Sequence, residues 1–279
     1  MVLLYAWTVP AFTSGSPVDH TWVTTYDNRV DAYQNDAAVT AAQQFYWYCW
    51  GAFHPKGGTP NIPDGFIGSQ AGNLALAQCL VQANADSRIV PAARGTIFFY
   101  GVDGVCHQLA NQVLYATGTS TLPQLTVRMA RGYMASTFIY GTYGLQSAAW
   151  ASKIAACSGT TLTPSGVAIM TGGAGGPGGP DDFEARASEV LGSDNTKLHD
   201  LLRLRGSVQQ FSMQAWPGTG QPSAETLNAR NQHMLDEAAR LLRPDEFEKI
   251  FGFAPGQKVD LVDKEITDSA GRIPPPTSR

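Results

Sequence analysis

The first half of the chain consists of short apolar runs separated by turn-forming residues, a pattern that predicts strands. Residues 2–10 and 20–27 are rich in Val, Trp, Thr and Tyr, and the run TSGSPVD separates them, so we expect two strands with a connection between them. The aromatic run FYWYCWGAF at 45–53 and the apolar run GTIFFYG at 95–101 predict two further strands. The composition of residues 54–65, HPKGGTPNIPDG, predicts an exposed loop.

Other segments carry a helical pattern. Residues 30–43 predict a loop and a short helix, and the Ala- and Leu-rich residues 70–85 predict a helix. A second helix is expected over 107–116, with its end near Gly118. Residues 125–157 predict an apolar, mostly helical stretch that is broken at three glycines, Gly132, Gly141 and Gly144.

The second half of the chain changes character after a glycine-rich run. TGGAGGPGGPDD at 171–182 predicts a flexible, protease-sensitive linker, because such a run cannot pack. The charged residues 182–250 contain helix-like segments, one of which, SAETLNARNQHMLDEAARLL, begins with the capping residue Ser223. Another, TKLHDLLRLRG, has a stripe at helical spacing that needs a partner surface, formed by Leu198, Leu201, Leu202 and Arg205.

Taken together, these patterns predict an α+β fold. We expect three parts: a first domain over residues 1–170, the linker at 171–182 and a mostly helical segment at 183–279. The tail from Thr267, which ends in IPPPTSR, is expected to be disordered. The apolar stripe predicts that the helical segment docks on the first domain.

Composition narrows the classes of partner and compartment. The net charge is −4, with 43% hydrophobic and 15% charged residues, so we expect no nucleic-acid partner. No apolar run has the roughly 18 residues that a membrane-spanning helix needs, and the first residues lack the features of a signal peptide. The four cysteines, Cys49, Cys79, Cys106 and Cys157, are dispersed. They favour reduced thiols and a cytoplasmic protein, with a secreted effector carrying two disulfides as the alternative.

The stretch GVDGVCHQLANQVLYATG at 101–118 carries the candidate chemistry. Cys106 lies where a strand gives way to a helix, and a helix start favours a thiolate. A base must come from a histidine elsewhere. His107 is poorly placed, because adjacent helical residues point about 100° apart. Since His199 and His233 are expected at the surface of charged helices, His20, at the start of a strand, is the favoured base.

Three pieces together resemble a known family of thiol enzymes. VLLYAWTVPA, DHTWVTTYD and GVCHQLANQVLYATG are similar to the matching parts of the circularly permuted papain-like enzymes, the NlpC-like group that includes the lecithin:retinol acyltransferase type. In that group the histidine precedes the cysteine. The resemblance covers roughly residues 1–120. It implies a fold with a small antiparallel sheet and packed helices, in which a histidine opens the second strand and a cysteine opens a helix packed against the sheet.

The resemblance also implies an activity. Cys106 would be the nucleophile and His20 the base of a cysteine hydrolase or acyltransferase that acts on an amide or ester, with helix-start amides stabilising the oxyanion. A third polar residue is expected in the region of Tyr46, Tyr48 and His54, and His54 is the candidate there. No cofactor or metal is implied. The substrate could be a peptide, a peptidoglycan stem, a lipid or a protein glutamine.

Three alternatives stay open. Cys106 could be a buried structural residue, since cysteine is among the most buried residue types. Cys49, His54, Cys106 and His107 could bind zinc, although Cys-x4-His followed by a distant Cys-His pair does not match a known zinc spacing. The chain could also be a non-enzymatic module that binds a partner protein through its charged C-terminal helices.

Overall fold

The computed structural model describes eight segments of the chain, residues 2–10, 16–24, 65–72, 100–117, 125–145, 181–192, 194–214 and 222–264. Several expectations lie outside these residues. They are the helix in 30–43, the strand at 45–53, most of the loop at 54–65, residues 73–85 of the helix at 70–85, most of the strand at 95–101, residues 146–157 of the stretch at 125–157, residues 171–180 of the linker and the tail from Thr267.

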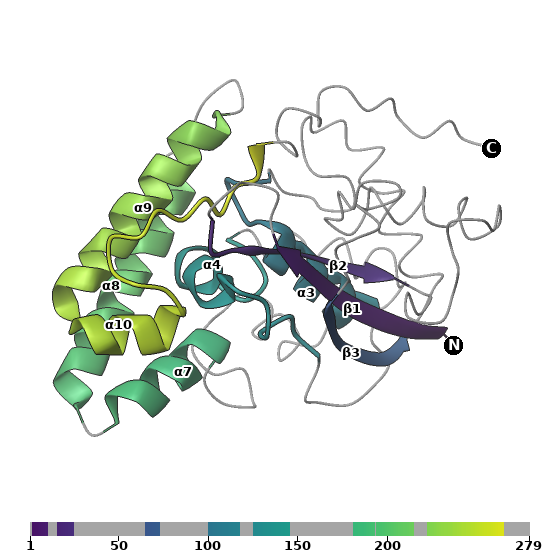
Figure 1. The fold of residues 1–279 in the computed structure, drawn as a ribbon, viewed down its shortest axis with the longest axis horizontal. Coiled ribbons are helices and arrows are strands. Elements are labelled where there is room, and N and C mark those ends of the chain that lie inside the picture. Colours follow the sequence, from purple (N-terminus) through teal and green to yellow (C-terminus); the bar gives the residue numbers. More distant parts are fainter. Residues whose placement is uncertain are drawn as a thin grey trace.

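The described part is α+β, as the sequence predicts, with one small antiparallel sheet (Figure 1). β1 (Val2–Pro10) is the central strand, β2 (Asp19–Thr24) pairs with one side of it and β3 (Gly65–Gly72) with the other. The two strands expected from the first apolar runs are therefore confirmed, and residues 25–27 of the second expected strand lie outside the described residues.

The two faces of the sheet differ. On one face lie Leu4, Ala6 and Thr8, with Thr21 directly opposite Thr8 on β2. α3 (Cys106–Thr117) covers this face, since it contacts β2 and β3 and its Leu114 carbonyl accepts a hydrogen bond from Gln70 Nε2 on β3. The opposite face carries aromatic residues, among them Tyr5, Trp7 and Phe66, whose rings contact one another.

β3 corrects part of the sequence prediction, which assigned residues 70–72 to a helix. The run GFIGSQAG has low strand propensity, so tertiary pairing with β1 sets its conformation. Its glycines permit close approach: a Cβ on Gly65 would lie 2.7 Å from Thr8 Cγ2, and one on Gly68 would lie 2.9 Å from Leu125 Cδ1. A local propensity argument cannot detect such contacts.

α4 (Tyr133–Tyr140) is the buried helix at the centre of the described structure. It begins after Gly132 and ends before Gly141, both with positive φ, which confirms two of the expected breaks. Only a short part of residues 125–145 is helical, so the long helical stretch expected there is wrong over these residues. α4 contacts α3 on one side and α7, α8, α9 and α10 on the other.

The described residues after residue 180 form four helices that group together beside α4 (Figure 1). They are α7 (Asp182–Leu191), α8 (Asn195–Gln214), α9 (Ala224–Leu241) and α10 (Pro244–Phe251). Ser223 Oγ caps α9 by accepting from the Thr226 amide, as expected. His199 and His233 are exposed on α8 and α9.

Among the described residues, a hydrophobic core joins these helices to the earlier segments. It contains Val18 and Tyr100 together with residues of α3, α4 and all four later helices. Leu201 is fully buried in this core, and Leu198 and Leu202 pack against it. The α8 stripe therefore docks on α4, as its spacing predicts.

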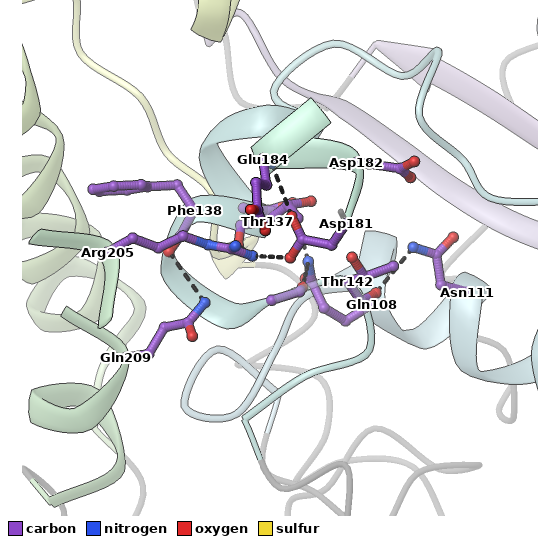
Figure 2. Close-up of polar contacts among 12 residues, drawn as sticks. Gln108, Asn111, Thr137, Phe138, Thr142, Asp181, Asp182, Glu184, Arg205 and Gln209 are labelled. Atoms are coloured by element: carbon purple, nitrogen blue, oxygen red, sulfur yellow. Dashed lines mark hydrogen bonds and ion pairs between the residues drawn. The ribbon is translucent and has the colours of Figure 1, made fainter. Parts of the chain in front are cut away.

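Polar contacts also connect α8 to α4 and to the start of α7 (Figure 2). Arg205 on α8 forms an ion pair with Asp181, and its guanidinium also donates to the Thr137 carbonyl of α4 at 3.2 Å. Asp181 in turn caps α7 by accepting from the Glu184 amide. One buried arginine thus joins the start of α7 to α8 and to α4. Within the described residues, no helix has both the length and the apolar character that crossing a bilayer requires.

Candidate functional site

Cys106 is the first residue of α3 and is only 3% exposed. Its Sγ–H donates to the Asp19 carbonyl oxygen of β2 at 3.8 Å. The backbone amide and the hydroxyl of Thr21 also lie beside the sulfur. The two residues that flank His20 in the sequence therefore both touch the thiol.

The thiol sits at the outer edge of β2, because the backbone groups of Asp19 point away from β1. The Asp19 amide donates to the Arg131 carbonyl, and the Asp19 carbonyl accepts from α3. The Asp19 carboxylate accepts from the Arg131 amide at 3.0 Å and from its Nε at 2.8 Å. Arg131 thus holds Asp19 in place, and the Asp19 carbonyl oxygen accepts the hydrogen bond from the Cys106 thiol.

Burial decides the protonation state of Cys106. Desolvation raises its pKa to about 12, although the Thr21 amide and hydroxyl favour the thiolate. The helix start therefore does not produce an activated thiolate in this arrangement, and the thiol is neutral near pH 7. The expectation of a lowered thiol pKa fails here because solvent is excluded from the sulfur.

Both ring nitrogens of His107 form hydrogen bonds. Nε2 donates to the Asp19 carbonyl at 3.0 Å, since a carbonyl oxygen can only accept, and Nδ1 lies 2.8 Å from Ser136 Oγ. Desolvation lowers the pKa of His107 to about 4, so the ring is neutral near pH 7. A weakly basic ring with both nitrogens engaged cannot act as the base, in agreement with the sequence argument.

The rest of the CHQLANQ stretch forms a buried polar face on α3 that the sequence analysis missed. Gln108 Nε2 donates to the Gly141 carbonyl, Asn111 Nδ2 to the Thr142 carbonyl and Gln112 Nε2 to the Tyr143 carbonyl. Figure 2 shows Gln108 and Asn111 close to Thr142, in the segment that follows α4. The polar pairs at i and i+4 (His107 with Asn111, and Gln108 with Gln112) were the available signal, because they put four polar residues on one side of the helix.

His20 lies in β2 between the two residues that contact the sulfur, and it is 2% exposed. Side chains alternate along a strand, so its ring leaves β2 on the face opposite to Thr21, the face that also carries Trp7. The pairing of His20 with Cys106 stays a prediction. His54 lies outside the described residues.

Of the four candidate zinc ligands, only Cys106 and His107 lie among the described residues. Cys49 and His54 lie outside the described residues, and both ring nitrogens of His107 are engaged. Among the described segments, no three of the residue types His, Cys, Asp and Glu come together in a way that could hold a metal ion.

A C-terminal segment, residues 258–264, reaches the neighbourhood of the thiol. We call it the strap. The Asn228 side chain of α9 accepts from the Val262 amide at 2.8 Å and donates to the Val262 carbonyl at 2.9 Å. The Asp263 amide donates to the Tyr100 hydroxyl at 3.3 Å, and the Asp263 carboxylate contributes to the raised pKa of Cys106. The strap thus brings a negative charge toward the thiol.

A cavity of about 400 Å³ lies between α9 and the strap. Its charged lining residues form pairs, Lys258 with Asp260 and Lys264 with Glu225, each at 3.0 Å. Cys106 does not line this cavity, so it is separate from the thiol site.

Comparison of the chain with protein-family models, with curated proteins and with solved structures finds no match. The geometry around Cys106 and the short motifs of the sequence are therefore the observations that bear on function.

Proposed function

We propose that the protein is a cysteine-dependent hydrolase or acyltransferase that acts on an amide or ester, built on a permuted papain-like arrangement. One observation carries the proposal: α3 begins at Cys106, and its sulfur lies against Asp19 and Thr21, the neighbours of His20 on β2. Thiol-enzyme chemistry requires a base within hydrogen-bond reach of the sulfur, and β2 is the strand beside Cys106 that carries the candidate histidine.

The chemistry follows a thiol acyl-transfer sequence. Cys106 Sγ gives its proton to the base and attacks the carbonyl carbon, so that an S–C bond forms and the carbonyl π electrons move to oxygen. Collapse of this intermediate breaks the C–N or C–O bond, and the leaving group takes the proton from the base. Water, or a second nucleophile, then attacks the thioester and restores the thiol.

His20 is the proposed base. Its two sequence neighbours both touch the sulfur, whereas His107 has a pKa of about 4 and two engaged ring nitrogens. The ring leaves β2 on the other face from Thr21. The proposal therefore includes a movement of the His20 side chain around the outer edge of β2 to the sulfur during the reaction, while Asp19 and Thr21 stay beside the sulfur. Substrate entry must also admit solvent to the sulfur, which lowers its pKa by removing the desolvation.

A second candidate is a non-enzymatic protein in which Cys106 is a core residue. The low exposure of the thiol, 3%, and its pKa of about 12 favour this alternative. In that case the α8–α9 surface, where Phe211 is 56% exposed, would serve for partner binding.

Activity assays with three variants distinguish the two candidates. The full chain is tested against activated esters, peptide amides and acyl lipids, together with Cys106→Ala, His20→Ala and the double variant. For a thiol enzyme, each single variant should lose at least about 100-fold in kcat/KM, with the double variant no worse, because the residues act as a unit. Unchanged turnover in Cys106→Ala, with a lowered Tm, would favour the structural role.

A further inference from the structure

Thr21 carries a buried hydroxyl next to the sulfur. The residue is 0% exposed, and among the described residues its Oγ1 has no hydrogen-bond partner that satisfies normal geometry. A buried hydroxyl without a partner loses its hydrogen bonds to water and gains none in return, which destabilises the folded state. Such a group therefore needs an explanation in the function or in the packing of the site.

Packing does not supply the explanation within the described segments. The residue opposite Thr21 on β1 is Thr8, whose own Oγ1 is likewise buried and lacks a described partner. The Asp19 carbonyl, an acceptor at the sulfur, already receives hydrogen bonds from Cys106 Sγ–H and His107 Nε2–H. In the neutral state of the site, the thiol proton faces Asp19, and the sulfur has no negative charge to receive the Thr21 proton.

We propose that Thr21 is a further catalytic residue of the Cys106 site, whose hydroxyl donates a hydrogen bond to Sγ once the thiol has lost its proton. This inference rests on the proposed function, because it assigns a role to a thiolate. In this step the S–H proton of Cys106 goes to the base. The hydrogen bond from Sγ–H to the Asp19 carbonyl is lost, and an O–H···S⁻ hydrogen bond from Thr21 replaces it.

β2 supplies a different hydrogen-bond partner for each protonation state of Cys106. Asp19 and Thr21 lie two residues apart in β2, so their backbone groups point to the same side of the strand. The Asp19 carbonyl is an acceptor for the thiol, and the Thr21 amide and hydroxyl are donors for the thiolate. Hydrogen bonds to a charged group are about twice as strong as neutral ones, so the hydroxyl contributes most in the reactive state.

The test measures the thiolate directly and needs no substrate. The full chain, Thr21→Val and Thr21→Ser are treated with limiting iodoacetamide between pH 7 and pH 10, and mass spectrometry gives the alkylation rate at Cys106. Thr8→Val is the matched control, because Thr8 is the cross-strand neighbour with an equally buried hydroxyl oxygen. Thr21→Ala replaces Thr21→Val if circular dichroism shows that the valine variant does not fold.

We expect the alkylation rate of Cys106 to fall about 10-fold in Thr21→Val, which corresponds to one pKa unit, and to recover in Thr21→Ser. Thr8→Val should react like the unmodified chain. Equal rates in Thr21→Val and the unmodified chain, or an equal loss in Thr8→Val, would overturn the assignment. Because the readout is alkylation, a missing esterase or amidase activity would refute the proposed function and leave this result standing.

Discussion

At the scale of residues, the site combines one neutral thiol with one neutral imidazole. Both groups are buried on the first turn of α3, and both donate to the same Asp19 carbonyl. Desolvation shifts the two pKa values in opposite directions, to about 12 for Cys106 and about 4 for His107. The site as described is thus uncharged at the two groups that the sequence brings together most closely.

The buried His107 predicts acid sensitivity of the fold. Its folded pKa, about 4, lies below the ordinary value of 6.5, so the unfolded chain binds a proton first as the pH falls. The stability from this group is therefore complete above about pH 6.5 and is lost as the pH falls toward 4, by about 3 kcal/mol in all. Urea unfolding of the unmodified chain at pH 7 and at pH 4.5 measures this loss.

Two variants show whether His107 is the source. His107→Gln cannot be protonated, so it should be less stable at pH 7 but should lose less stability on acidification. His233→Gln, at an exposed position of α9, should keep the full pH dependence. An identical pH dependence in His107→Gln and the unmodified chain would show that other groups cause the acid sensitivity.

At the scale of elements, the turn of residues 100–104 links the start of α3 to the strap and α9. Gly101 has φ +82, and a Cβ there would lie 2.7 Å from Val262 Cγ1 and 2.8 Å from Leu227 Cδ1. Its carbonyl accepts from the Tyr140 hydroxyl of α4 at 2.8 Å. Four segments distant in sequence therefore meet at one glycine.

Gly101→Ala should destabilise the protein by about 3 kcal/mol, because the left-handed conformation costs about 1–2 kcal/mol and the overpacking adds a similar amount. Gly256→Ala is the matched control. Gly256 has φ +75, but a Cβ there would have no neighbour within 4 Å, so the expected loss is about 1 kcal/mol. Chemical denaturation gives both values, and equal losses would contradict the close packing of the strap on this turn.

Elements whose residues carry a local signal could be predicted from the sequence. β1, α3 and α9 follow from apolar runs, helical spacing and the Ser223 cap. β3 could not be predicted, since Gly65 and Gly68 are poor strand residues that only the pairing with β1 and the contact with Leu125 explain. At the site, the sequence predicts the place of Cys106, whereas its burial and the role of Thr21 depend on contacts between distant segments.

At the scale of the whole molecule, α4 connects the sheet region to the later helices. Phe138 on α4 contacts Phe183 of α7, with ring centroids 5.2 Å apart, and Phe251 of α10, at 5.6 Å. The strap then returns from α10 past α9 to Tyr100. The C-terminal helices therefore support the residues around Cys106, which links the integrity of the whole described structure to the chemistry proposed for the thiol.

The most direct test of the central claim is to trap an acyl group on Cys106. The full chain is incubated with p-nitrophenyl acetate, quenched in acid and digested, and the Cys106 peptide is analysed by mass spectrometry. The account predicts an acetyl thioester at Cys106 that neutral hydroxylamine removes, that is absent in Cys106→Ala and that forms much more slowly in His20→Ala. An unmodified Cys106 peptide, with p-nitrophenol released at the same rate by Cys106→Ala, would contradict it.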